Sequence, residues 1–260
     1  VLSALVGIYG SKELFANEYR LMLARKLLER TDFDTDREVH NLELLKLRFG
    51  EQSMRQCEVM IKDIDDSKRI NANIRSTIRN EMRAEAEGKD GYGDDDLENI
   101  EPVVDAAIVS HIFWPPLQKD PLNNHPRIQS HLDRFSDEYA KLKNPRKLVW
   151  LPQLGSVTLE LEVEDEDGEG VHTREFTCSP LQATLISHFE DRETWRASEL
   201  SDEIGAPAEA VMKRMAYWTA RRAVRAQRTP DGDVSYTLAS CRDFAEADQE
   251  EGGSGGAAAL

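Results

Sequence analysis

Apolar residues recur every three or four positions through two segments near the start of the chain, Ser11 to Arg30 and Glu38 to Ile78. This spacing predicts helices that each bury one face against other helices. The predicted buried positions of the first segment are Phe15, Tyr19, Leu23 and Leu27, with Met22 and Leu28 beside them. Those of the second segment are Val39, Leu42, Leu45, Phe49, Cys57, Ile61, Ile64, Ile74 and Ile78. We therefore expect residues 1–80 to form a helical bundle.

The charge and the cysteines narrow the class of protein. A formal net charge of −16 argues against a general nucleic-acid binder, because such proteins gain most of their affinity from cations on phosphates. Cys57, Cys178 and Cys241 are far apart and fit reduced thiols better than a disulfide framework. Val1 to Gly10 is short for a membrane span and has no basic leader. We expect a fragment of a soluble protein of the nucleus and cytoplasm.

The chain changes character after the predicted bundle. Residues 81–102 are rich in acids and glycine, which predicts a flexible acidic insertion. Val103 to Ser110 favours an extended strand. A further amphipathic helix is predicted before Asn144-Pro145, since a proline ends regular structure. Its apolar stripe is Ile128, Leu132, Phe135, Tyr139 and Leu142.

A β-hairpin is predicted after this helix. Val157 to Val163 alternates apolar and polar residues, which is typical of a half-buried strand with an acidic outer face. Val171 to Cys178 returns as its partner across an acidic turn at residues 165–170. Lys147 to Leu151 is a candidate third strand of the same sheet. Residues 103–178 are therefore expected to form an α/β domain.

Residues 179–240 have the order of a winged helix, three helices followed by a β-hairpin. Ser179 and the three residues after it approximate a capping box, which predicts the start of the first helix. The second helix is predicted to stop at Gly205, and the third follows directly. A turn at Thr229 to Gly232 joins the two strands of the hairpin. Residues 241–260 are acidic and then rich in glycine and alanine, so we expect a disordered tail.

Several runs of this sequence resemble the C-terminal region of the cullin family. They include Ile-Tyr-Gly-Ser-Lys-Glu-Leu-Phe-Ala-Asn-Glu-Tyr-Arg (Ile8 to Arg20), Asn-Leu-Glu-Leu-Leu-Lys (Asn41 to Lys46) and Arg-Ile-Asn-Ala-Asn-Ile (Arg69 to Ile74). The resemblance extends over residues 4–240 as many scattered positions in one order. It implies an α+β protein in which a cullin-like helical bundle is followed by an α/β domain and a winged helix.

The resemblance implies a non-catalytic scaffold of a multi-subunit RING E3 ubiquitin ligase that marks cell-cycle regulators for degradation. In such ligases the cullin-type scaffold holds a small zinc-binding RING subunit, and that subunit recruits a ubiquitin-conjugating enzyme. The implied partners are the RING subunit, the conjugating enzyme through it, and other subunits of the ligase. The scaffold supplies proximity and orientation, while its partners transfer ubiquitin.

The resemblance also implies where the RING subunit binds. An extended segment of that subunit adds a strand to the cullin sheet, because unpaired main-chain groups at a sheet edge accept another strand. We expect this surface in the sheet predicted within residues 147–178. The expected site residues are Trp150, Val157, Leu159, Leu161, Val163 and Phe176.

Two other functions stay open. One basic cluster lies in the acidic chain and favours a protein contact or, alternatively, DNA or chromatin binding by the winged helix. Its members are Lys213, Arg214, Arg221, Arg222, Arg225 and Arg228. Cys178 lies between a strand and a helix N-terminus and is a candidate nucleophile of a thioester-forming ligase. No base is recognisable beside Cys178, and a buried structural thiol is the simpler interpretation.

The sequence predicts neither a metal site nor a cofactor. The histidines are scattered, and no Cys/His pair has the spacing of a zinc finger. There is also no phosphate loop, dinucleotide fingerprint or nucleophile elbow in the sequence. The histidines are His40, His111, His125, His131, His172 and His188.

Overall fold

The computed structural model describes residues 11–86, 102–117, 123–164 and 171–240. Helices and strands are both present, which confirms the α+β class. The chain divides into two compact units, one made of residues 1–118 and 131–149 and the other of residues 119–130 and 150–260. Among the helices described, none is both long enough and apolar enough for a membrane span.

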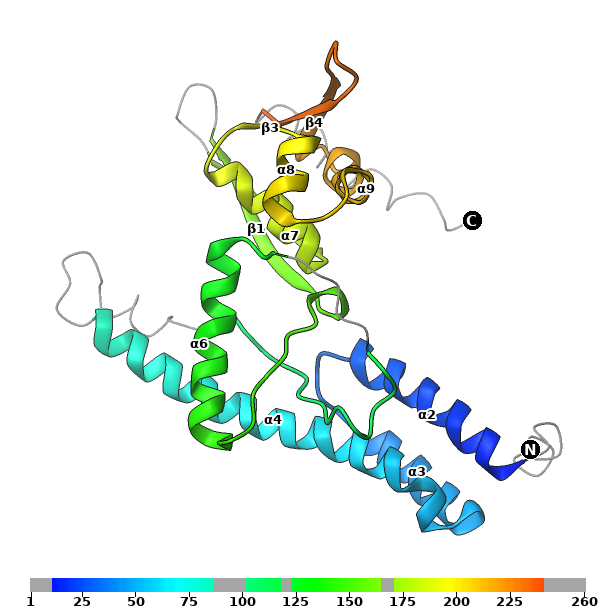
Figure 1. The fold of residues 1–260 in the computed structure, drawn as a ribbon. Helices are drawn as coiled ribbons and strands as arrows, with labels where there is room; N and C mark the ends of the chain where they lie inside the picture. Colours follow the sequence, from blue (N-terminus) through cyan, green and yellow to red (C-terminus); the bar gives the residue numbers. More distant parts are fainter. Residues whose placement is uncertain (1–10, 87–101, 118–122, 165–170, 241–260) are drawn as a thin grey trace, which may run out of the picture. The chain divides into compact units, whose positions relative to one another are not determined.

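Three helices make the core of the first unit (Figure 1). They are α2 (Lys12–Glu29), α3 (Asp36–Phe49) and the long α4 (Glu51–Ala86), and both α2 and α3 pack on α4. Gly50 separates α3 from α4 with a φ of 88° and a ψ of 150°. The shared core is Phe15, Leu23, Ala24, Leu27, Leu42, Leu45, Phe49, Met54, Cys57, Met60, Ile61, Ile64 and Trp114.

Most of the predicted helical stripes are buried, with two exceptions. Val39 is 40% exposed and Met22 is 53% exposed, so the prediction that they are buried was wrong. On α3 the buried position is the preceding residue, Glu38, whose carboxylate pairs with Lys26 and Arg30 of the α2 region. Glu38 thus extends the buried stripe of Leu42, Leu45 and Phe49 toward the start of α3.

The predicted strand from Val103 to Ser110 is extended but pairs with no strand in the described part of the chain, so this prediction was wrong. Side chains of α4 take its main-chain hydrogen bonds instead. Asn71 bonds both main-chain groups of Ala106, and Ser67 accepts from the Ile108 N–H at 2.8 Å. A helix face thus replaces the neighbouring strand that the pattern indicated.

The remaining helix of this region, α6 (Pro126–Lys143), begins in the second unit and ends in the first. Phe135 and Tyr139 are buried as predicted, whereas Leu142 at the last turn is 44% exposed. Helix α4 reaches Ala86, six residues past the predicted end of the bundle. Residues 87–101 of the predicted insertion, the turn at 165–170, the N-terminal ten residues and the tail at 241–260 lie outside the described residues.

The second unit begins with a two-stranded antiparallel hairpin, β1 (Val157–Glu164) and β2 (Val171–Cys178). The predicted third strand at Lys147 to Leu151 was wrong, since this segment has no regular structure. The segment leads directly into the short 3-10 helix η1 (Pro152–Leu154). Pro152 has no N–H to extend a ladder of main-chain hydrogen bonds.

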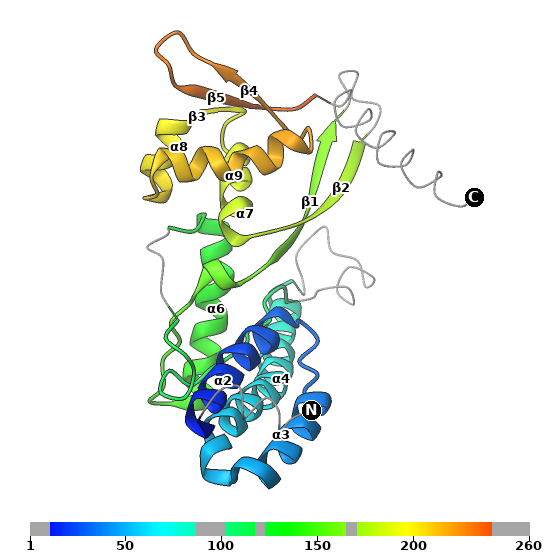
Figure 2. The ribbon, with the colours of Figure 1, turned by 90° about the vertical axis from the view of Figure 1, so that its right-hand side faces the viewer.

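The helices and strands after the hairpin confirm the predicted element order and add one strand (Figure 2). A three-stranded antiparallel sheet has the order β3-β5-β4. Strand β3 was not predicted, because three residues are too few to display a period. The elements are α7 (Pro180–Ser187), η2 (His188–Glu190), β3 (Thr194–Arg196), α8 (Ala197–Ile204), α9 (Ala208–Ala220), β4 (Val224–Arg228) and β5 (Val234–Leu238).

Helices α7, α8 and α9 enclose the core of this second unit. Val211, Met215 and Trp218 of α9 are fully buried, as their spacing predicts. The Trp218 indole N–H donates to the Gln182 carbonyl at 2.9 Å and so joins α9 to α7. Ser179 and Gln182 form the predicted capping box at the start of α7.

Candidate functional site

One face of the β1–β2 hairpin is apolar and packs on the core of the second unit. The cross-strand pair Leu159 and Phe176 lies on this face, and Phe176 is 4% exposed. The Phe176 ring packs edge to face on the Trp218 indole, with ring centroids 5.3 Å apart. Three further site residues predicted from the sequence, Val157, Leu161 and Val163, are partly buried against the same core.

Trp150, the sixth predicted site residue, is not part of the hairpin. It lies in the irregular segment before η1 and is half-buried. The structure therefore brings five of the six residues onto one face. That face is covered by helices of the same unit, so the other surfaces of the hairpin are the ones open to another chain.

The opposite face of the hairpin is polar and exposed. Glu160 lies directly across from Glu175, and Thr158 lies across from Thr177. The two threonine hydroxyls are 3.3 Å apart. Because like charges opposite one another destabilise a sheet, the Glu160–Glu175 pair contributes nothing to the stability of the hairpin.

The main-chain N–H and C=O groups that point outward at each edge of the hairpin can be assigned from one contact. The Tyr217 hydroxyl of α9 donates to the Thr177 carbonyl at 2.7 Å, which indicates that this carbonyl points away from β1. In an antiparallel pair the two main-chain groups of one residue point the same way, and alternate residues share that direction. The outward groups are therefore those of Thr173, Glu175 and Thr177 on β2, and those of Thr158, Glu160 and Glu162 on β1.

The two edges differ in what lies next to them. The end of β2 is flanked by α9, where a shallow pocket of about 270 Å³ is lined by side chains of both elements. Arg174 donates to the Arg221 carbonyl at 3.3 Å across it, and the Arg221 guanidinium lies 3.7 Å from the centre of the Tyr217 ring. Neither β1 nor β2 pairs with a further strand within the described residues. The pocket with α9 is lined on the hairpin side by residues of β2, and the edge without this pocket is called here the open edge of β1.

The predicted basic cluster spreads over α9, its C-terminal end and β4. Lys213 and Arg214 are exposed on α9, and Arg225 and Arg228 are exposed on β4. Arg221 and Arg222 are half-buried at the junction between α9 and β4. The Arg225 guanidinium donates to the Ser240 hydroxyl at 3.2 Å. The cluster is thus a surface strip and not a single pocket.

Cys178 does not have the environment of a nucleophile. Its side chain is 6% exposed at the end of β2, and burial raises the pKa of the thiol to about 11. The Arg221 charge acts in the opposite direction and is the smaller influence. A thiol that stays protonated at neutral pH is a poor nucleophile, which supports the structural interpretation of this cysteine.

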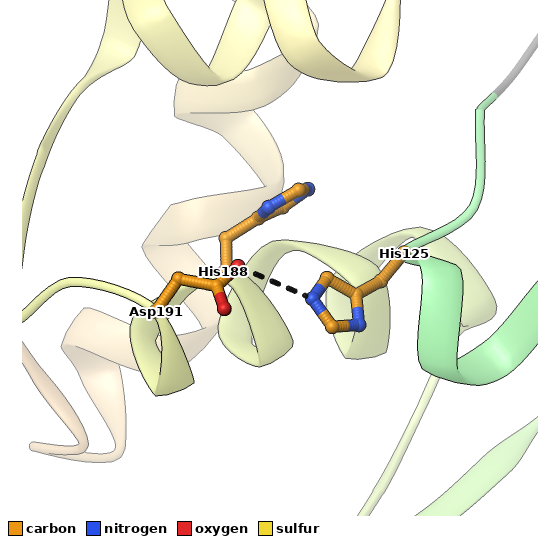
Figure 3. Close-up of side chains that lie close together, drawn as sticks. All are labelled: His125, His188 and Asp191. Atoms are coloured by element: carbon orange, nitrogen blue, oxygen red, sulfur yellow. Dashed lines mark ion pairs between the residues drawn. The ribbon is translucent and has the colours of Figure 1, made fainter.

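Sequence reasoning missed one cluster of metal-ligating side chains, His125, His188 and Asp191 (Figure 3). One ligand atom from each lies within 4.8 Å of the others, and both histidines are buried. The two histidines are 63 positions apart and come from the start of α6 and from η2, so no local spacing could reveal them. Only the i, i+3 relationship of His188 and Asp191 is visible in the sequence.

Known proteins of the cullin family are similar in sequence to this chain. Residues 108–233 match the family model of the cullin alpha+beta domain. Anaphase-promoting complex subunit 2 of Arabidopsis thaliana is 37% identical over 97% of this chain and 27% of its own length. The protein of the same name from Homo sapiens is 39% identical over 90% of this chain and 26% of its own length. The predicted resemblance to the cullin family is confirmed.

The cullin similarity extends beyond this one subunit. Cullin-3 of Schizosaccharomyces pombe is 24% identical over 70% of this chain and 21% of its own length. The chain spans about a quarter of the length of the curated relatives it matches. The hairpin and the histidine cluster both fall inside the matched cullin alpha+beta domain, whereas α2, α3 and most of the bundle core precede it.

Proposed function

We propose that this chain is part of a cullin-type scaffold of the anaphase-promoting complex, a multi-subunit RING E3 ubiquitin ligase. It binds a small RING-type zinc-binding subunit, which in turn positions a ubiquitin-conjugating enzyme. The other partners are further subunits of the same complex, and the site of action is the nucleus and cytoplasm. The chain itself carries out no chemical step. Its similarity to anaphase-promoting complex subunit 2 and the open edge of β1 support this proposal.

The proposed domain organisation follows the element order. A cullin bundle is formed by α2, α3 and α4, an α/β domain includes α6 and the hairpin, and a winged helix begins at α7. In that winged helix, α9 is the third helix and the β4–β5 hairpin is the wing. The strand order β3-β5-β4 supports this assignment. Strand β3 lies between α7 and α8 in the sequence, and this order places it beside the β4–β5 wing.

The open edge of β1 carries the proposal because it is a ready-made template for an added strand. Its outward N–H and C=O groups belong to Thr158, Glu160 and Glu162, three residues with exposed side chains. An extended segment of the RING subunit pairs with these main-chain groups. The exposed glutamates beside them favour a segment that carries lysine or arginine.

A proline scan of the hairpin tests this edge. Glu160→Pro removes one outward N–H from β1 and leaves the N–H groups that join β1 to β2 in place. Glu175→Pro is the matched control, because Glu175 lies directly opposite and its N–H points outward at the other edge. Each chain is co-expressed with a RING-type subunit of the complex, and copurification is quantified.

We expect Glu160→Pro to weaken copurification by roughly tenfold or more, since a lost main-chain hydrogen bond to the partner costs about 1–3 kcal/mol. Glu175→Pro should copurify like the unmodified chain. Equal binding by both variants would place the partner elsewhere. If the unmodified chain retained no RING-type subunit at all, the scaffold proposal itself would be wrong.

The alternative function is DNA or chromatin binding by the winged helix. The exposed positions of Lys213 and Arg214 on its third helix favour it. A DNA titration over a series of salt concentrations discriminates, because several phosphate contacts require a steep loss of affinity as salt rises. The acidic net charge of −16 opposes this alternative, and we expect no measurable binding at physiological salt.

A further inference from the structure

His125, His188 and Asp191 converge from two different parts of the second unit (Figure 3). His125 directly precedes Pro126, the first residue of α6. His188 begins η2 and Asp191 follows that 3-10 turn. A three-residue separation eclipses side chains on a 3-10 helix, so His188 and Asp191 project from the same side. The start of α6 brings the third side chain to them.

The distances suit one small cation. The Nε2 atom of His125 lies 3.7 Å from the Oδ2 atom of Asp191, and the three ligand atoms lie within 4.8 Å of one another. In a tetrahedral zinc site with bonds of about 2.0–2.1 Å, neighbouring ligand atoms are about 3.4 Å apart. The His125–Asp191 distance is already near that value. The Asp191 side chain is 69% exposed and can rotate to close the remaining gap.

The two imidazoles are held in a buried aromatic environment. His188 is 8% exposed, and its ring meets His125 and Trp195 edge to face at centroid distances of 4.9 and 5.5 Å. The Trp195 indole donates to the His188 carbonyl at 2.8 Å, which fixes the main chain beneath the ring.

We propose that His125, His188 and Asp191 bind one divalent transition-metal ion, with zinc as the best match. Two imidazole nitrogens and one carboxylate oxygen form a borderline ligand set of the kind that zinc accepts, and water completes the coordination. The ion links the beginning of α6 to η2, two segments 63 positions apart. Its role is to stabilise the second unit at this junction.

One contact sets a limit on the affinity. The Nδ1 atom of His125 accepts from the Arg127 N–H at 3.4 Å, as an N-cap of α6 does. When Nε2 binds the metal, Nδ1 carries the proton and this long hydrogen bond is lost. Metal-bound histidines ordinarily gain a hydrogen bond at the second nitrogen, which contributes about 10–100-fold to affinity. We therefore expect micromolar binding, weaker than that of a closed structural zinc site.

Zinc binding to the purified chain tests the proposal, with competition against a chromophoric chelator as the readout. The measurement is made on the chain with Cys241→Ser, because the Cys241 thiol in the tail is an independent ligand for zinc. Cobalt absorption then reports the nitrogen and oxygen coordination, and thermal unfolding with and without zinc reports the link to stability.

Three variants target the site and one serves as the control. His125→Asn keeps an acceptor for the Arg127 N–H and removes the imidazole, so α6 remains capped. Asp191→Asn removes the exposed carboxylate without altering the core, and His188→Gln replaces the buried ring. His40→Asn changes an exposed histidine of α3 outside the site.

We expect one equivalent of zinc to bind and to raise the thermal unfolding temperature. His125→Asn and Asp191→Asn should each weaken binding at least tenfold while the chain without zinc unfolds as before. His40→Asn should leave binding unchanged. The proposal is wrong if zinc binds no more tightly than millimolar, or if all three site variants bind like the parent chain.

Discussion

Asn71 and Ala106 lie 35 positions apart in the sequence and share two hydrogen bonds. The Asn71 amide donates to the Ala106 carbonyl at 2.9 Å, and the Ala106 N–H donates to Asn71 Oδ1 at 3.0 Å. One turn earlier on α4, Ser67 accepts from Ile108, and one turn before that Asp63 accepts from the Ser110 N–H at 2.8 Å. Three side chains at four-residue intervals on a helix therefore satisfy alternate residues of an extended segment.

Asn71→Ala is expected to destabilise the first unit by about 3 kcal/mol. The substitution leaves two buried main-chain groups of Ala106 without partners, and each costs about 1–3 kcal/mol. Hydrogen exchange at the Ala106 amide, measured with urea unfolding, reports the effect directly. Asn73→Ala is the control, since Asn73 is exposed on the same helix. Equal losses in both variants would contradict the proposed role of Asn71.

Lys26 compensates the negative charge of the buried Glu38 carboxylate. Glu38 is 1% exposed, and its oxygens accept no hydrogen bond of regular geometry within the described residues, so its charge is offset by Lys26 and Arg30 alone. Lys26→Met should destabilise the first unit by about 3 kcal/mol, because it leaves a buried charge poorly compensated.

The double variant Lys26→Met with Glu38→Leu is expected to recover most of the stability lost in Lys26→Met. Replacing both partners of a buried ion pair with apolar residues is often neutral or stabilising. Urea unfolding of the single and double variants measures the difference. A double variant less stable than Lys26→Met would show that Glu38 has partners beyond the two cations.

Local patterns account for most of the helices. Apolar spacing predicted α2, α3, α4 and α6, and Gly205, at φ 70°, ends α8 as expected. Strict alternation predicted β1 together with the face that is buried. These features were predictable because each is decided by residues within one or two turns of one another.

The errors arise where distant groups decide the outcome. Val103 to Ser110 has a strand-like pattern, but whether its partner is a strand or a helix depends on side chains of α4. Val39 has the right spacing for burial, yet Glu38, four positions before Leu42, is the buried residue and pairs with cations of the α2 region. The cluster of His125, His188 and Asp191 requires α6 and η2 to meet, which is a property of tertiary packing.

Cys178 is expected to make the second unit less stable at alkaline pH. Its pKa is ordinarily 9.0 and is raised by burial to about 11, so the folded state keeps the proton over that interval while the unfolded state releases it. The contribution of the protonated Cys178 thiol to the free energy of unfolding is therefore fully present below pH 9 and decreases as the pH rises toward 11.

Cys178→Ala should lessen this alkaline decline, measured by thermal unfolding between pH 8 and pH 11. Alkylation of Cys178 at pH 8 should also be slow in the folded chain and fast in denaturant, since both burial and protonation protect the thiol. Rapid alkylation of the folded chain would mean that the end of β2 opens readily.

Gly50 holds a conformation that other residues rarely adopt. Its φ of 88° and ψ of 150° lie in a region occupied almost only by glycine, whereas Gly205 at φ 70° and ψ 26° lies in the ordinary left-handed region. A Cβ at Gly50 would meet nothing within 4 Å, so any loss of stability on substitution comes from the backbone alone.

Gly50→Asn is therefore expected to cost about 2 kcal/mol, and Gly205→Asn less than about 1 kcal/mol, because asparagine tolerates the left-handed region. Urea unfolding followed by circular dichroism measures both. Equal costs would indicate that the α3–α4 junction relaxes into a left-handed turn. A large cost confined to Gly50 would show that the α3–α4 junction cannot leave this backbone conformation, in keeping with the burial of Phe49 and Met54 on either side of it in one core.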